Sequence, residues 1–389
     1  DRKMAGNLKD LNRDNDIASV STLLREAIPL TGSIVSGTYA NPSGVAVSTT
    51  SNIKQYAHGM FQSVYDYPYA SSSANHLFDI TAGYSTNSSL DGNANEISGA
   101  KKNNIYNEMS QFLVGYDRSG NIERFDKDGD LTGGPKIDEV LVINFARLLS
   151  KDGIQKGTFE LELGVSGGYT GYPQEGAFDQ RIKIKDLNGT GSYKVNSPKG
   201  EYGILYANNS EGRPLDGDSF FNTTTVKTAP CGLLYYQAGV AVISASMFMN
   251  VQQTGLMSAS QDNLIWHSGS SDGLWDIKEA LTTGSVDTIA TGLRHRLYNL
   301  SFNNTTILNS TMYTCRVASR DFNYSSNPTY LSGSEIIVKG GDPKSEPKTF
   351  ITTVGLYSAQ DELLAVAKLS KPIEKSPKED LLIKVRLDY

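Results

Sequence analysis

Several stretches of this chain alternate apolar and polar residues with a period of two, the pattern of a half-buried strand. The stretch "GTFELELGV" places four apolar side chains on one face and two carboxylates on the other: Phe159, Leu161, Leu163 and Val165 against Glu160 and Glu162. "RIKIKD" repeats the alternation, whereas "EYGILYA" and "GLLYYQAGVAVISASMF" are more continuously apolar. The middle of the chain therefore predicts an antiparallel sheet with some fully buried strands.

The last third of the chain has the most regular pattern. "TMYTCRVAS", "KTFITTVGLYS", "DELLAVAKLS" and "DLLIKVRLDY" are strand candidates separated by turn residues. In the final one, Ile383, Val385 and Leu387 share a face with Leu381 and Tyr389, and Lys384, Arg386 and Asp388 share the other. We expect this segment to be a paired strand with its apolar face buried, within a C-terminal antiparallel β-sandwich.

Three segments show helical spacing instead. In residues 16–28, "DIASVSTLLREAI", apolar residues recur every three or four positions, Asp16 is a plausible N-cap and Pro29 follows. Residues 51–66, "SNIKQYAHGMFQSVYD", are a second helix candidate. After a polar stretch over 85–103, "NNIYNEMSQFLVGYD" groups Ile105, Met109, Phe112 and Leu113 on one face, with Gly115 as the stop.

A chain of 389 residues is too long for one hydrophobic core. We predict a mainly β fold with a few helices (α+β), organised in several domains. Residues 1–103 would hold an N-terminal helix and an extended, loop-rich region. Residues 104–260 would form a middle α+β domain, and residues 261–389 the C-terminal β-sandwich.

Charge and composition argue against several classes of function. The net charge is −6 and no segment concentrates Lys or Arg, so the basic surface that nucleic acid requires is not indicated. The longest apolar stretch is interrupted by Gln237 and Gly239 and does not reach the roughly 20 residues of a membrane span. Four His and two Cys are scattered without metal-ligand spacing, and no nucleotide-binding or nucleophile motif occurs. We therefore expect no cofactor, small-molecule substrate, nucleic acid or membrane partner.

One short motif could bind a metal ion. In "RFDKDGDLTGG", Asp126, Asp128 and Asp130 match positions 1, 3 and 5 of an EF-hand calcium loop. Such a loop has Gly at position 6 and a bidentate Glu at position 12, where this chain has Leu131 and Ile137. The sequence alone favours a solvated turn that does not depend on calcium, with a weak, nonstandard site as the alternative.

Residues 104–389 resemble structural proteins of tailed phages, particularly large phages with contractile tails. The segments that carry the resemblance include "IYNEMSQFLVGYD", "RFDKDGD", "INFARLLSKDGIQKGTF", "LRHRLYNLSFNNTT", "DFNYSSNPTYLSGSEI" and "ITTVGLYSAQDELLAVAKLSKPIEK". The resemblance implies a non-enzymatic virion subunit of the tail, most specifically its baseplate, with no catalytic residues to carry over. Its expected partners are other virion proteins and copies of itself. Its expected location is the phage particle, after synthesis in the host cytoplasm.

Other functions stay open at this point. One alternative is a receptor- or carbohydrate-binding β-sandwich, which would present an exposed aromatic platform near Trp266 and Trp275. A neck or capsid-associated subunit and an unfamiliar hydrolase are two more. For an assembly role, "RDFNYSSNPTYLSGS" is the segment that we expect at a subunit contact, because it places Phe322, Tyr324 and Tyr330 among turn-forming residues. An ordered loop packed on its own domain would look the same.

Overall fold

The computed structural model describes residues 11–26, 52–92, 96–149, 152–165, 180–209, 212, 215, 229–249, 256–257, 266–269, 273–325, 327–337 and 346–388. The chain is mainly β, with antiparallel sheets and a few helices, as the sequence predicted. It divides into two compact units: unit 1 comprises residues 1–24 and 307–389, and unit 2 comprises residues 25–306.

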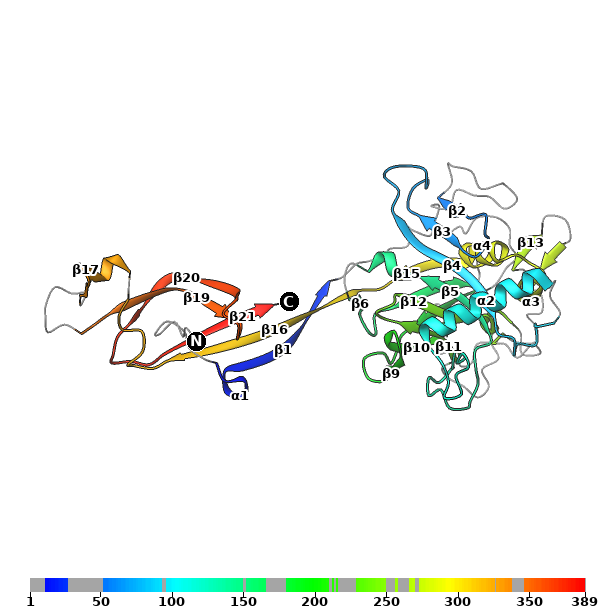
Figure 1. Ribbon diagram of the computed structural model, residues 1–389. Helices are drawn as coiled ribbons and strands as arrows, with labels where there is room; N and C mark the ends of the chain where they lie inside the picture. The colour runs from blue at the N-terminus through cyan, green and yellow to red at the C-terminus, as the bar shows by residue number, and fades with distance from the viewer. Residues whose placement is uncertain are drawn as a thin grey trace. The chain divides into compact units, whose positions relative to one another are not determined.

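Unit 2 is built on a sheet of eleven strands. Ten of them follow each other in this order: β15 (Leu297–Ser301), β7 (Glu160–Gly164), β8 (Arg181–Lys185), β10 (Gly200–Asn209), β11 (Ala229–Tyr235), β12 (Val240–Ser244), β5 (Glu139–Asn144), β4 (His76–Tyr84), β3 (Gln62–Tyr65) and β2 (Ile53–Gln55). The eleventh, β9 (Lys194–Ser197), pairs with β10. Figure 1 labels β15, β12, β5, β4, β3 and β2 of this sheet in unit 2, together with β9, β10 and β11. A short strand, β6 (Gly153–Ile154), pairs separately with the start of β16 (Asn304–Val317).

The central strands of the unit 2 sheet are buried on both faces. On β5, Val140 and Val142 belong to one apolar core, while Leu141 and Ile143 between them belong to a second, larger core. The continuous apolar runs noted in the sequence are therefore strands covered on two sides. The alternating strands β7 and β8 differ, because their apolar faces are buried while Glu160 and Lys183 on the other face are half-buried and ion-paired.

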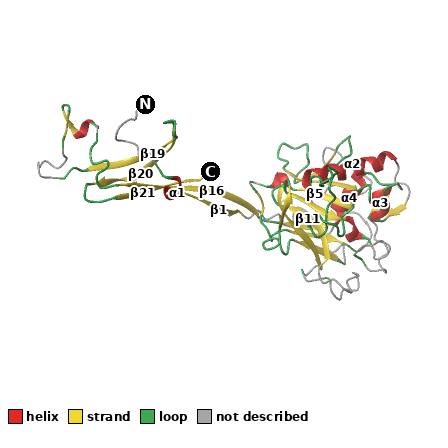
Figure 2. Ribbon diagram, turned by 60° about the horizontal axis from the view of Figure 1, so that its bottom comes forward, coloured by secondary structure: helices red, strands yellow, loops and turns green. Residues whose placement is uncertain are grey.

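Helices complete the two cores of unit 2 (Figure 2). Helix α2 (Glu96–Leu113) adds Tyr106 and Leu113 to the smaller core. Helices α3 (Ile277–Thr282) and α4 (Val286–Arg296) contribute to the larger one. Helix α4 begins at Ser285, whose Oγ accepts a hydrogen bond from the Thr288 amide at 3.1 Å, as N-caps do. Within the described residues, no helix is long and apolar enough to cross a membrane.

Unit 1 contains long antiparallel strands. β16 lies between β1 (Ile17–Glu26) and β21 (Leu381–Asp388). β19 (Thr349–Tyr357) and β20 (Leu363–Lys375) form a separate hairpin, and the short strands β17 (Leu331–Ser332) and β18 (Glu335–Ile336) form another. The C-terminal prediction is confirmed for β21: it is paired along its length with β16, and Ile383 and Val385 are buried. Leu387 is only half-buried, and Tyr389 lies outside the described residues.

Two predicted helices are wrong. In place of a helix over 16–28, a four-residue helix α1 (Arg13–Asp16) is followed at once by strand β1. The segment 51–66 contains the hairpin of β2 and β3. Both segments have β-branched residues at apolar positions, which favour extended backbone. Strand pairing then decides their conformation: β1 pairs with the distant β16, and β2 pairs with the neighbouring β3. Helix α2 is confirmed, but it begins inside the stretch predicted as a polar loop, and Phe112 is exposed while Tyr106 is buried.

The two units also differ from the three predicted domains. The boundary at 103/104 separates β4 from β5, which are neighbours in one sheet. The boundary at 260/261 separates β7 from β15, which also pair. Strand pairing between residues far apart in sequence joins these regions, and local composition carries no mark of it.

Candidate functional site

The acidic motif forms a loop on the α2 side of unit 2. The two ends of the loop are joined by backbone pairing. Asp126 and Lys136 form an isolated antiparallel β-bridge, and the Ile137 amide donates to the Phe125 carbonyl at 2.9 Å. Phe125 and Ile137 are buried in the smaller core, and the Tyr106 hydroxyl of α2 donates to the Ile137 carbonyl at 2.8 Å. The core and α2 thus fix the base of the loop, and its tip carries the carboxylates.

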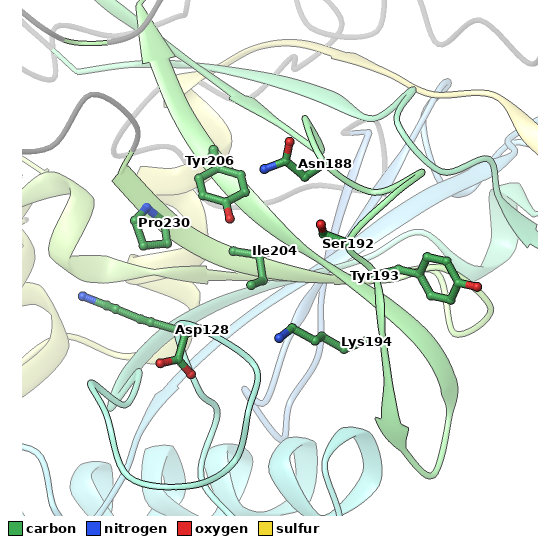
Figure 3. A pocket seen from close by; sticks show the side chains of 9 residues that line it. Asp128, Asn188, Ser192, Tyr193, Lys194, Ile204, Tyr206 and Pro230 are labelled. Atoms are coloured by element: carbon green, nitrogen blue, oxygen red, sulfur yellow. The ribbon is translucent and has the colours of Figure 1, made fainter.

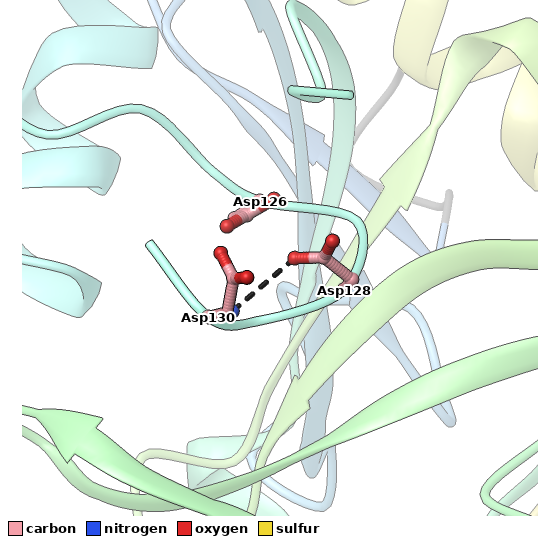
Figure 4. A group of neighbouring side chains, drawn as sticks. All are labelled: Asp126, Asp128 and Asp130. Atoms are coloured by element: carbon pink, nitrogen blue, oxygen red, sulfur yellow. Dashed lines mark hydrogen bonds between the residues drawn. The ribbon is translucent and has the colours of Figure 1, made fainter. Parts of the chain in front are cut away.

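The three aspartates converge at this tip. Their carboxylate oxygens lie within 4.8 Å of one another, and Figure 4 shows the carboxylates of Asp126 and Asp130 facing each other. Asp128 and Asp130 are exposed, whereas Asp126 is 1% exposed. The Asp130 amide donates to Asp128 Oδ1 at 3.2 Å, and the Thr132 amide donates to Asp130 Oδ1 at 2.7 Å.

Asp126 uses only one of its two oxygens in hydrogen bonding. Oδ2 accepts the Leu131 amide at 2.7 Å and lies 3.3 Å from the Lys136 ammonium. Oδ1 is buried and accepts no hydrogen bond from the residues that the structure describes. Burial raises the pKa of Asp126, against the opposing effects of the Leu131 amide and Lys136. For Asp130, the Thr132 amide is the main cause of a lowered pKa.

The structure removes one of the two sequence arguments against a metal and supports the other. Leu131 adopts a left-handed backbone with φ 62°, so the loop bends at position 6 without glycine. Ile137 at position 12 is buried in the core, and the two carboxylates that follow it are engaged elsewhere. Asp138 pairs with Arg124 at 2.9 Å, and Glu139 accepts from Ser88 Oγ at 2.5 Å. No carboxylate therefore closes the loop from position 12.

The acidic loop forms one wall of an open pocket of about 480 Å³ (Figure 3). The other walls come from β9, β10, β11 and the segment before β9; the lining residues are Lys127, Asp128, Asn188, Ser192, Tyr193, Lys194, Ile204, Tyr206 and Pro230. The loop is docked here, because the Gly129 carbonyl accepts hydrogen bonds from Asn196 Nδ2 at 3.0 Å and from the Tyr202 hydroxyl at 3.2 Å. The lining holds two lysines and one carboxylate, and Asp128 belongs to both pocket and loop.

The structure brings a serine, a histidine and an aspartate together on β3 and β4, the combination that a hydrolase would use. Ser63 Oγ donates to Asp79 Oδ1 at 2.5 Å, and His76 Nε2 lies 2.7 Å from the same oxygen. In a catalytic triad the histidine bonds to the hydroxyl whose proton it accepts. Here both groups bond to the carboxylate, so the arrangement is not that of an activated serine.

The predicted contact residues of unit 1 have three different environments. Tyr324 is 55% exposed, Phe322 is half-buried with φ 54°, and Tyr330 is 9% exposed. Tyr330 therefore packs within its own unit, while Tyr324 is free to meet a partner. Two hydrogen bonds fix the segment within unit 1. Asn323 Nδ2 donates to the Ser319 carbonyl at 2.8 Å, and Thr349 Oγ1 donates to the Phe322 carbonyl at 2.5 Å.

Lys375 also holds this segment in place, and nothing in the sequence pattern marks it. Its buried ammonium donates to the Ser319 carbonyl at 2.9 Å, to Asn323 Oδ1 at 3.1 Å and to the Ser376 carbonyl at 2.7 Å. No local pattern distinguishes it from Lys371 on the same strand, which is exposed.

We expect Lys375→Met to lower the free energy of unfolding of unit 1 by about 2–3 kcal/mol, because it leaves buried acceptors without a donor. Urea unfolding of the full chain measures this. Lys371→Met is the matched control and should change stability by no more than about 0.5 kcal/mol. Equal effects from the two substitutions would show that the buried contacts do not hold the segment.

The aromatic platform expected for sugar binding is not formed by Trp266. This residue is fully buried against Phe248, and its indole donates to the Ile289 carbonyl at 3.3 Å. The side chain of Trp275 lies outside the described residues.

The chain matches no protein-family model, no curated protein and no solved structure.

Proposed function

We propose that this chain is a non-enzymatic structural subunit of a phage virion, a tail or baseplate component that acts through protein–protein assembly. The resemblance of residues 104–389 to structural proteins of contractile-tailed phages supports the class of protein. The geometry of unit 1 supports the mode of action, and it is the observation on which the proposal depends.

Unit 1 exposes apolar side chains that its own sheets do not cover. Eight of the fifteen exposed large apolar residues in the described part of the chain belong to it, although it is the smaller unit. They are Tyr324, Ile337, Phe350, Tyr357, Leu363, Leu364, Val366 and Leu382. Most lie on β19, β20 and β21. Exposed apolar surface is typical of interaction sites when it is extensive, and an assembly subunit would bury such side chains against its neighbours.

The hairpin β19–β20 shows the pattern most clearly. On β20, Leu364 is 67% exposed and Val366 is 57% exposed, and these residues lie two apart on one face of the strand. On the other face, Ala365 and Ala367 are half-buried. Leu363, next to this pair, is also 53% exposed, so the hairpin presents several large apolar side chains to solvent at the start of β20.

The proposal is tested first by mass spectrometry of purified particles. Peptides of this chain should co-purify with the known tail proteins of particles produced in cells that express it. Within the particle, the chain should bury more than about 2,000 Å² against other chains, as permanent assemblies do. Particles that contain no peptide of the chain would refute a virion role.

We expect the double substitution Leu364→Lys and Val366→Lys to reduce incorporation into particles by at least about tenfold, because each lysine would have to be desolvated in the contact. The isolated variant should keep the wild-type melting temperature, since both positions are exposed in the free chain. Val195→Lys is the control: this β9 residue in unit 2 is 70% exposed. Normal incorporation of the double variant would exclude this face from the assembly contact.

A further inference from the structure

The three aspartates of the acidic loop present their oxygens to a common point. They occupy alternate positions along the backbone, and their carboxylate oxygens approach within 4.8 Å (Figure 4). Like charges at this separation repel each other unless a cation or a proton lies between them. The two outer residues, Asp128 and Asp130, are exposed, so solvent alone could screen them. The cluster of carboxylates therefore does not by itself indicate a bound ion.

A second feature of the site is the oxygen Asp126 Oδ1. The side chain of Asp126 is fully buried, and Lys136 and the Leu131 amide both contact its other oxygen, Oδ2. Oδ1 is left as a buried carboxylate oxygen with no hydrogen-bond donor among the described residues, on the residue whose carboxylate faces Asp130 in Figure 4. A buried acceptor without a partner costs roughly 1–3 kcal/mol, and more when it is charged. A cation held between the three carboxylates would supply the missing partner.

We propose that Asp126, Asp128 and Asp130 bind a calcium ion. Carboxylate oxygens are hard ligands that suit Ca²⁺ and Mg²⁺. Lys136, 3.3 Å from Asp126, offsets part of the negative charge of the three carboxylates, and a divalent ion would offset more of it. Mg²⁺ requires a near-ideal octahedron, whereas Ca²⁺ accepts the irregular set of ligands that a loop without a closing Glu provides. Since that bidentate ligand is missing, the affinity belongs to the weak class, with a Kd of about 10⁻⁴–10⁻³ M.

The full chain, freed of divalent ions with a chelator, is titrated with CaCl₂ by calorimetry. We expect one site with a Kd in that range. About 10 mM CaCl₂ should raise the melting temperature of unit 2 by a few degrees over NaCl of the same ionic strength. Asp128→Asn and Asp130→Asn should each weaken binding by about tenfold or more, because affinity follows the number of charged ligands.

The matched control is Asp117→Asn. Asp117 is a half-buried aspartate in a neighbouring turn, where Oδ1 accepts the Ser119 and Asn121 amides at 2.8 Å. It has the local geometry of a turn without the other carboxylates, so its substitution should leave the calcium affinity unchanged. Asparagine keeps the turn-forming oxygen in all three variants, which protects the fold of the loop.

Tb³⁺ luminescence measures binding directly and can therefore be used for variants of lower stability. Tb³⁺ replaces Ca²⁺ at oxygen sites and emits when a nearby tyrosine is excited; the Tyr202 hydroxyl bonds to the loop at Gly129. We expect Tb³⁺ emission that Ca²⁺ displaces in the wild type and in Asp117→Asn, but not in Asp128→Asn. Absence of calorimetric heat and of displaceable emission in the wild type would overturn the proposal. So would an Asp128→Asn variant with wild-type affinity. The virion role is tested separately, on particles, and survives either result.

Discussion

A chain that ends at Asp380 is expected to lose the folded state of unit 1 while unit 2 stays folded. Strand β21 makes eight register pairs with β16, from Ser310–Asp388 to Val317–Leu381. Its Ile383 and Val385 are 7% and 8% exposed. Removing residues 381–389 leaves one edge of β16 unpaired and takes these side chains out of the core of unit 1, so that the truncated chain should aggregate or be digested there.

Limited proteolysis followed by mass spectrometry measures this result. The truncated chain should yield a resistant fragment close to residues 52–306, whereas the full chain should resist in both units. Two neighbouring substitutions separate burial from pairing. Ile383→Ser should destabilise unit 1 by about 2–4 kcal/mol, whereas Leu382→Ser, at a residue 55% exposed, should stay within about 0.5 kcal/mol. Unchanged solubility and proteolysis of the truncated chain would show that β21 is dispensable.

The sequence predicted the strands in which apolar and polar residues alternate with a period of two. β7, β8 and β21 each place apolar residues at every second position, and one slip in register would expose them all. The two apolar halves of "GLLYYQAGVAVISASMF" were predicted to be buried strands, and they are β11 and β12, which pair across a turn where Gly239 has φ 64°. In these segments the local pattern and the final contacts agree.

Residues 17–26 show where local pattern fails. Spacing of three and four suits a helix, but Ile17 and Val20 are β-branched and the segment pairs with β16, almost 300 residues away. Several buried polar partners are also far apart in the sequence. Buried Asp186 accepts the Tyr236 hydroxyl at 2.8 Å, and Lys102 of α2 donates to the Leu281 and Thr282 carbonyls of α3. A single sequence carries no mark of such pairs.

The acidic loop is an intermediate case. Its residue types and spacing were visible in the sequence, and so was the missing closing Glu. The left-handed backbone of Leu131 was not, because β-branched and bulky residues rarely adopt it. The burial of Asp126 was also not visible, since it depends on Phe125 and Ile137 entering the core under α2. Those two facts are what turn a plausible solvated turn into a candidate metal site.

The second large effect is expected from Gly83, where α2 crosses β4. A Cβ atom at this position would lie 2.5 Å from the Lys102 carbonyl oxygen and 2.9 Å from the Tyr106 amide nitrogen. Both are backbone atoms of a helix, so neither moves without displacing α2. Gly83→Ala should lower the free energy of unfolding of unit 2 by about 2–3 kcal/mol, and Gly83→Val by about 4 kcal/mol or more.

A displaced α2 would also disturb the segments that it contacts, so the effect of Gly83→Val should appear in a defined set of elements. Lys102 is buried and bonds to the end of α3, and Tyr106 packs on Phe125 at the base of the acidic loop. Hydrogen exchange should therefore quicken in α2, α3 and residues 122–138 together. Gly191→Ala is the control, because its Cβ would meet no atom within 4 Å and its φ is not positive. A Gly83→Val variant as stable as Gly191→Ala would mean that α2 does not pack against β4 as described. Calcium binding should weaken in the same variant, since the loop rests on the helix that has moved.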